Sequence, residues 1–310
     1  MNAFKKTTHS IRALLALAVL LTAAAPVRAQ FNTITNNGGI VITGYSGPGG
    51  TVVIPATITG LPVVSIGSNA FYAKSSITFV ALPPTVLSIQ TTAFQFCVNL
   101  AGISMQPGLT NVDLDSFQGC VSLTNLTLPG TVISVGSSAF LDCFALRSVT
   151  LSASLTNLGN SVFYNCYDLG SIAIPRGVNS VGVTAFQSCS ALTNICFFGN
   201  APTVSTGAFQ SDTISTVYYT SNTTGWSNTF QGIPTVLWNP QIQTNAAVNN
   251  GTFKLTVTGT PGIPVLLQGA GSLSGFGWTP LASVILTNGS YSYSEPVQSS
   301  SGRFFSVVFP

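Results

Sequence analysis

The chain has 310 residues, enough for two folded units with their own cores. Only 5% of the residues are Asp, Glu, Lys or Arg, where about 25% is typical of globular proteins. This composition disfavours long salt-bridged helices, and the abundant Ser, Thr, Asn and Gly residues favour β-structure with a polar, uncharged surface.

The first 29 residues have the pattern of a secretory signal peptide. Three basic residues precede an apolar run at 13–25, and Val27-Arg28-Ala29 provides a small-x-small cleavage pattern. The run is shorter than the roughly 20 residues of a membrane span, and no later run reaches that length. We therefore expect cleavage after Ala29 and a soluble protein that is secreted, exposed at the cell surface or periplasmic.

The leader also explains the positive charge of the whole chain. It carries four of the nine basic residues and the single histidine, His9. Its removal leaves five basic and six acidic residues, so nucleic acid is not an expected partner. A mature chain without histidine cannot build a Ser-His-Asp or Cys-His site and lacks the commonest transition-metal ligand. We predict no enzyme activity, no cofactor and no metal.

Residues 71–209 repeat at an interval of 23 residues. A Phe is followed three residues later by Cys in the central repeats and six residues later by Leu or Ile in nearly every repeat. An apolar-x-apolar pair such as Leu126 with Leu128 then predicts a short strand ended by proline, and a second inward pair predicts another extended piece. The two main columns are Phe71, Phe94, Phe117, Phe140, Phe163, Phe186 and Phe209, and Cys97, Cys120, Cys143, Cys166 and Cys189.

A polar column two residues before each Phe predicts a short capped helical turn. Ser, Thr, Asp and Asn are the side chains preferred at helix N-caps, and the apolar residues that follow lie on one side of a single turn. One coil cannot offset an ordering entropy of about 1–2 kcal/mol per residue, so the coils must stack and share a core. The polar column is Asn69, Thr92, Asp115, Ser138, Ser161 and Thr184.

The repeat consensus Ser/Thr-x-Ala-Phe-x-x-Cys-x-x-Leu-x-x-Val-x-Leu-Pro-x-x-Val-x-x-Val-Gly is most complete at residues 127–151. It resembles the BspA-like class of leucine-rich repeats over residues 38–238. The resemblance implies a mainly β, right-handed solenoid with a cap at each end, in a bacterial secreted or surface protein. Members of this class mostly bind host proteins or other cells, so the resemblance implies adhesion or protein binding and no reaction.

Beyond Pro240 the 23-residue interval disappears. Alternation at 253–257, an Asn288-Gly289 hairpin signal and further short apolar runs up to Phe309 predict a small antiparallel β-sandwich. We therefore predict three segments: the signal peptide at 1–29, the capped solenoid at 30–240 and the sandwich at 241–310.

The outward positions of the strand that follows each Phe form the candidate binding surface. They are uncharged and can form hydrogen bonds, and solenoids use such extended surfaces for macromolecules. We expect a protein or surface polymer to bind here, with Phe79 and Phe198 as exposed aromatic residues. The alternative is a carbohydrate-binding accessory module of an exported polysaccharide-related system, favoured by any glycan binding that depends on Trp226 or Trp278. The surface residues are Asn125, Thr127, Ser148, Thr150, Ser171 and Asn194.

The cysteines and carboxylates have structural interpretations. Stacked cysteines could reach disulfide distances in an oxidising compartment, but five in a row cannot all pair, so we favour a column of small buried apolar side chains. Cys196 lies outside this column at an outward strand position and is the thiol expected to be exposed. The carboxylates occupy different columns and are interpreted as caps and solvated corners instead of a calcium site or a catalytic pair: Asp113, Asp115, Asp142 and Asp168.

Overall fold

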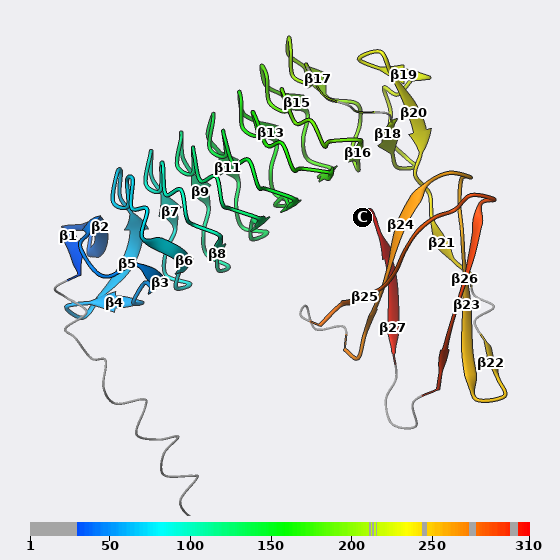
Figure 1. Cartoon of the computed structure of the whole chain (residues 1–310), viewed down its shortest axis with the longest axis horizontal. Helices are drawn as coiled ribbons and strands as arrows, with labels where there is room; N and C mark the ends of the chain where they lie inside the picture. Colours follow the sequence, from blue (N-terminus) through cyan, green and yellow to red (C-terminus); the bar gives the residue numbers. More distant parts are fainter. Residues whose placement is uncertain are drawn as a thin grey trace, which may run out of the picture.

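The computed structural model describes residues 30–210, 212, 214, 216–243, 247–272, 277–297 and 303–310, and the predicted signal peptide lies outside them. The chain forms a long stack of coils followed by antiparallel sheets at its C-terminal end (Figure 1). The predicted fold, a solenoid of 23-residue coils with a small C-terminal β-sandwich, is thereby confirmed. Among the described residues, no helix is long and apolar enough to cross a membrane.

Nearly every coil contributes one strand to a parallel sheet that we call the front sheet. Neighbouring strands keep the repeat register, with Leu126 opposite Val149 and Ile172 opposite Ile195. These residues are buried because alternate residues of a strand point to opposite faces. The front sheet is hydrogen-bonded in the groups β3-β6-β8, β10-β12 and β14-β16-β18-β20. Its strands are β3 (Gly50–Val53), β6 (Ile77–Ala81), β8 (Gly102–Ser104), β10 (Asn125–Thr127), β12 (Ser148–Thr150), β14 (Ser171–Ile174), β16 (Asn194–Phe197), β18 (Thr216–Tyr219) and β20 (Ile233–Leu237).

A second set of short strands, which we call the back sheet, lies on another side of the coils. It is hydrogen-bonded as β1-β2-β5-β7-β9-β11 and β13-β15-β17, parallel except for the antiparallel pair β1 and β2. The strands are β1 (Phe31–Asn36), β2 (Gly39–Tyr45), β5 (Leu61–Ile66), β7 (Ser88–Ile89), β9 (Asn111–Val112), β11 (Ser134–Val135), β13 (Asn157–Leu158), β15 (Ser180–Val181) and β17 (Thr203–Val204). Two further strands, β4 (Thr57–Ile58) and β19 (Thr229–Phe230), pair antiparallel with β5 and β20.

The third side of each coil, which we call the turn edge, carries the repeated Phe. It contains no helix in the described chain, so the predicted helical turns are wrong. Alternate backbone N–H groups donate to the next coil: Phe94 N to Ser116 O and Phe96 N to Gln118 O, both at 2.8 Å. The N–H between them closes a tight turn within the coil, from Gln95 to the carbonyl of Thr92. An α-helix needs every N–H for the carbonyl four residues back, so this ladder between coils excludes one.

The residues predicted as helix N-caps adopt left-handed backbone conformations, where an N-cap residue would be extended. Their φ values lie between 53° and 59° in all six coils. Their side chains form hydrogen bonds along the stack. Thr92 Oγ1 donates to Asn69 Oδ1 at 2.9 Å, and the hydroxyl oxygens of Ser161 and Thr184 are 2.7 Å apart. Short polar side chains therefore mark this column for a different reason from the one predicted.

The seven repeated Phe rings form one file through the interior of the solenoid. Neighbouring ring centroids are 4.9 to 5.7 Å apart and the rings are within 9° to 17° of parallel. All are fully buried except Phe209, which is partly buried near the end of the file. Tyr45 stacks on Phe71 at the N-terminal end of the file. Towards the C-terminal end of the solenoid, Trp226 packs on Phe197 of β16, a residue outside the file. Each coil thus completes the core of its neighbours.

The C-terminal unit is a sandwich of two antiparallel sheets. Leu255 and Val257 from one sheet meet Val265 and Leu267 from the other in a second buried cluster. The first sheet contains β21 (Gln241–Ile242), β22 (Ala247–Asn249), β23 (Thr252–Thr258) and β26 (Ser290–Pro296). The second contains β24 (Pro264–Ala270), β25 (Thr279–Ile285) and β27 (Phe304–Val308).

Candidate binding surface

The outer face of the front sheet presents two uncharged polar residues in each of the strands β10 and β12. Asn125, Thr127, Ser148 and Thr150 are all exposed. The parallel register sets Asn125 opposite Ser148 and Thr127 opposite Thr150. Because the backbone groups of paired strands bond to one another, the amide and hydroxyl side chains decide what this face can bind.

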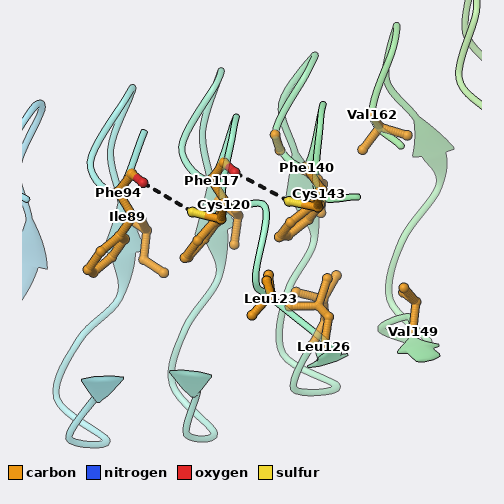
Figure 2. Packing of buried hydrophobic residues seen from close by; sticks show 14 of the residues in the cluster. Ile89, Phe94, Phe117, Cys120, Leu123, Leu126, Phe140, Cys143, Val149 and Val162 are labelled. Carbon is orange, nitrogen blue, oxygen red and sulfur yellow. Dashed lines mark hydrogen bonds between the residues drawn. The ribbon is translucent and has the colours of Figure 1, made fainter. Parts of the chain in front are cut away.

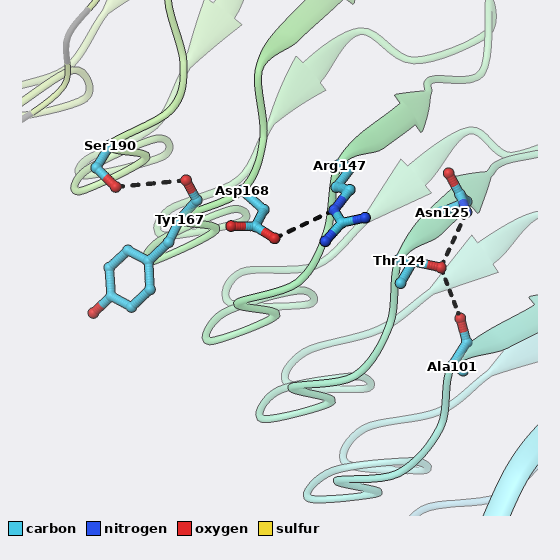
Figure 3. A network of polar contacts seen from close by, with 7 residues as sticks. All are labelled: Ala101, Thr124, Asn125, Arg147, Tyr167, Asp168 and Ser190. Carbon is cyan, nitrogen blue, oxygen red and sulfur yellow. Dashed lines mark hydrogen bonds and ion pairs between the residues drawn. The ribbon is translucent and has the colours of Figure 1, made fainter.

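A series of polar contacts runs along the border of this face, where the chain enters each front strand (Figure 3). Thr124 Oγ1 donates to Ala101 O at 3.3 Å, and Asn125 Nδ2 donates to Thr124 Oγ1 at 3.0 Å. Arg147 Nε donates to Asp168 Oδ2 at 3.3 Å in an exposed ion pair between successive coils. These contacts connect neighbouring coils, so the residues of the face are held in a regular array.

The other two residues predicted on this surface are partly covered. Ser171 in β14 and Asn194 in β16 are half-buried, and Ser171 Oγ donates to the Pro310 carbonyl at 2.6 Å. Figure 1 places the C-terminus on the side of the sandwich that faces the solenoid. The structure therefore divides the predicted surface into an open part on β10 and β12 and a part next to the sandwich.

Cys196 in β16 is fully buried, so the prediction of an exposed thiol is wrong. Its side chain belongs to the buried cluster of the sandwich, together with Tyr218, Trp238 and Phe309. Trp238 Nε1 donates to the Pro264 carbonyl at 2.8 Å, which attaches the last front strand to the sandwich. Burial raises the pKa of the Cys196 thiol, so the thiol stays protonated at neutral pH.

A change in the outward column of the front sheet marks where the sandwich docks. In β8, β10 and β12 this column is polar, but from β14 onward it is apolar. Val53 of β3 and Ala81 of β6 are apolar in the same column, and Val53 is 67% exposed, so an apolar member by itself does not predict a cover. From β14 onward the row packs against the buried cluster of the sandwich. The polar members are Ser104, Thr127 and Thr150, and the apolar members are Ala173, Cys196, Tyr218 and Val236.

The aromatic residues singled out in the sequence have different surroundings. Phe79 is 38% exposed, whereas Phe198 is half-buried and packs edge-on against Trp238 at 5.9 Å. Trp226 stacks on Tyr219 at 5.3 Å within the C-terminal end of the solenoid. Trp278 is half-buried just before β25. Phe79 is thus the aromatic residue that lies exposed on the open part of the front sheet.

The five cysteines of the turn edge are buried free thiols. Figure 2 shows two of them, Cys120 and Cys143, with their hydrogen bonds to the preceding coil. Each Sγ donates to the carbonyl of the Phe in the preceding coil, at 2.9 Å for Cys97 and 3.4 Å for Cys143. Burial raises the pKa of Cys97 to about 11, and it also raises the pKa of the other four thiols. The column therefore combines small apolar volume with a hydrogen bond between coils, and its thiols are protonated and poorly reactive.

The four carboxylates do not converge. Asp168 pairs with Arg147, and Asp142 Oδ1 accepts a hydrogen bond from Asn165 Nδ2 at 2.8 Å. Burial raises the pKa values of Asp113 and Asp115 above the usual range. In the described part of the chain, no group of three or more His, Cys, Asp or Glu side chains is placed to hold a metal ion.

The repeats match the BspA type leucine-rich repeat region, in 6 copies over residues 64–143 and 110–234. The leucine-rich-repeat protein of T. pallidum is similar in structure, with 31% identity and a TM-score of 0.54, over 63% of this chain and 85% of that chain. A leucine-rich cell surface protein of Faecalibacterium prausnitzii is similar at 23% identity and a TM-score of 0.48, over 67% and 75%. A search of curated proteins found no match. The chain belongs to the BspA type family of leucine-rich-repeat proteins.

Proposed function

We propose that this protein is exported and acts as a non-catalytic scaffold that binds another protein, at a cell surface or outside the cell. Membership in a leucine-rich-repeat family supports a repeat scaffold. The basic and apolar pattern of the first 29 residues supports export. We assign binding to the open part of the front sheet, and we call Phe79, Asn125, Thr127, Ser148 and Thr150 the binding face.

The observation that carries this assignment is an exposed aromatic ring beside an uncharged, hydrogen-bonding array. The Phe79 ring lies over Gly102 of the next coil, where an added Cβ would come within 3.1 Å of the ring. The ring is therefore held against the sheet while 38% of the residue stays exposed. Protein interfaces typically combine aromatic anchors with polar groups and few charges in the centre. The binding face has this composition.

The sandwich supplies one boundary of the binding face. It covers Cys196 and bonds to Ser171, so the outward residues of β14 and β16 are less available to a large partner. The residues of β10 and β12 remain exposed. A partner protein would therefore approach the coils between β6 and β12.

Two double variants test the proposal. Thr127→Arg with Thr150→Arg places two long charged side chains on the binding face. Ser134→Arg with Asn157→Arg places the same groups on exposed positions of the back sheet and serves as the control. The partner is first captured from the extracellular and cell-envelope proteins of the producing organism, and its direct binding to the purified chain is then measured by surface plasmon resonance.

We expect the front-sheet variant to weaken binding by at least about tenfold and the back-sheet variant to change it less than about twofold. Both variants should keep the thermal unfolding temperature of the parent, because all four positions are exposed. Equal weakening by both variants, or the lack of any protein that binds the purified chain directly, would contradict the proposal.

A further inference from the structure

A cavity of about 460 Å³ opens between the two sheets of the sandwich. Phe253 and Glu295 line it from the first sheet, and Gly269, Thr279 and Phe305 line it from the second. Its volume lies within the range of roughly 300–1,000 Å³ that is typical of small-molecule sites. The cavity is separate from the binding face and lies in the part of the chain outside the repeat region.

Two of the few charged residues of this chain meet at the cavity. Residues 241–310 contain three charged side chains, and two of them, Glu295 and Arg303, form an ion pair on the cavity wall. Tyr293 Oη also donates to Glu295 Oε2, at 2.8 Å. The Glu295 side chain is only 17% exposed. The Arg303 side chain is 36% exposed, and ion pairs that reach solvent contribute little net stability. We therefore look for a role in recognition for the pair, because it lies on a cavity wall in an otherwise nearly uncharged unit.

The guanidinium of Arg303 is held in place from three sides. It pairs with Glu295, and its Cζ lies 5.8 Å from the centre of the Phe305 ring. Gly269 has no side chain and so leaves room for the guanidinium, since a Cβ at this position would lie 3.0 Å from Arg303 Nε. Phe305 is in turn stacked on Phe253 at 4.9 Å. The polar groups of the cavity are therefore fixed before any ligand enters, which lowers the entropic cost of binding.

The pair offers both kinds of hydrogen-bonding group to a ligand. Among the described residues, Tyr293 and Arg303 both bind Oε2 of Glu295, so Oε1 is available as an acceptor. The guanidinium has five N–H donors and uses one of them for Glu295. A hydroxyl group can donate to the carboxylate while a neighbouring hydroxyl accepts from the guanidinium. The aromatic rings supply the apolar wall that packs against C–H groups.

We propose that this cavity binds a neutral saccharide. Vicinal hydroxyls of a pyranose ring match the adjacent acceptor and donor of Glu295 and Arg303. The pair has no net charge, so an acidic sugar would meet the Glu295 carboxylate and an amino sugar would meet the Arg303 guanidinium without a counter-charge. Desolvating such an unpaired charge is costly, which favours the neutral ligand.

Isothermal titration of the purified chain 30–310 tests this site with named probes. The neutral probes are maltose, cellobiose, mannose and N-acetylglucosamine, and the charged probes are glucuronate and glucosamine. Gly271→Leu adds a bulky side chain at the cavity rim without a clash, because Gly271 lines the cavity and a Cβ there would meet no atom within 4 Å. Gly130→Leu is the matched control, since its Cβ also meets open space, but on the solenoid. Glu295→Gln removes the charge and keeps the shape.

We expect at least one neutral probe to bind, and Gly271→Leu and Glu295→Gln each to weaken it at least about tenfold, with no change for Gly130→Leu. If Glu295→Gln fails to fold, Gly271→Leu alone decides the outcome. The proposal is overturned if no neutral probe binds at concentrations up to about 10 mM, if a charged probe binds more tightly, or if Gly271→Leu leaves binding unchanged. The front-sheet variants should not affect saccharide binding, so the two proposals can fail separately.

Discussion

Removing one ring from the middle of the Phe file tests whether the coils share a single core. Phe140 is fully buried, with its ring centroid 5.4 Å from that of Phe117 and 5.6 Å from that of Phe163. A buried Phe→Ala substitution costs about 3–5 kcal/mol of unfolding free energy, and each lost ring pair adds to the loss of burial. We expect Phe140→Ala to fall in the upper half of this range, because both stacking partners lose a neighbour. That loss is a large fraction of the 5–15 kcal/mol typical of whole proteins.

Phe209→Ala provides the matched comparison. Phe209 has one stacked neighbour, Phe186 at 5.7 Å, and is only partly buried. We expect a loss of about 1–2 kcal/mol, because less surface is buried and one ring pair is removed. Urea denaturation followed by far-ultraviolet circular dichroism measures both variants, with unfolding free energies taken from midpoints and slopes. Equal losses for the two variants, or a loss below about 1.5 kcal/mol for Phe140→Ala, would refute the reasoning.

Three further predictions follow from burial and charge. The six thiols should react with a disulfide reagent such as DTNB only when the protein unfolds, because all six are buried and their pKa values are raised. Rapid labelling of the native chain, for example at Cys196, would contradict this prediction. Burial raises the pKa of Asp212 to about 7, and its Oδ2 has no hydrogen-bond partner among the described residues. The folded pKa lies above the unfolded value of about 3.9, so the contribution of Asp212 to stability is full below about pH 4 and is lost as pH rises to about 7. Asp212→Asn should remove about 1–2 kcal/mol of this pH dependence, allowing for partial exposure, and a pH profile of the variant parallel to that of the parent would argue against it. Arg147→Gln should change the unfolding free energy by less than about 1 kcal/mol, because its ion pair with Asp168 is exposed. A larger loss in the same urea titration would contradict this prediction.

The columns that face the solenoid core could be predicted from the sequence because they depend only on spacing. An aromatic residue every 23 positions has to occupy equivalent sites in equivalent coils, and Leu126 and Leu128 point inward by strand alternation alone. The alternation at 253–257 likewise predicted a strand of an antiparallel sheet. The Asn288-Gly289 hairpin prediction was wrong, because this turn joins β25 and β26, which pair with β24 and β23 in two different sheets. The cavity of the sandwich carried no such signal, since Glu295 and Arg303 are separated by residues with no motif between them.

The conformation of the turn edge was mispredicted because two structures use the same residues. Short polar side chains favour helix N-caps, but they also tolerate left-handed backbone and bond to the next coil. The choice depends on where the backbone N–H groups find acceptors. Here the acceptors are carbonyl groups of the neighbouring coil, as for Phe94 and Ser116, and no local pattern contains that information.

Only the folded chain shows which segments cover the outer face of the front sheet. The alternation of a strand shows which way Ser171 and Cys196 point, and it was correct for both. It cannot show that Pro310, 139 residues later, returns to bond with Ser171, or that Tyr218 and Trp238 bury Cys196. Periodicity reports the direction of a side chain relative to its own strand, whereas its exposure depends on every segment that comes to rest above it.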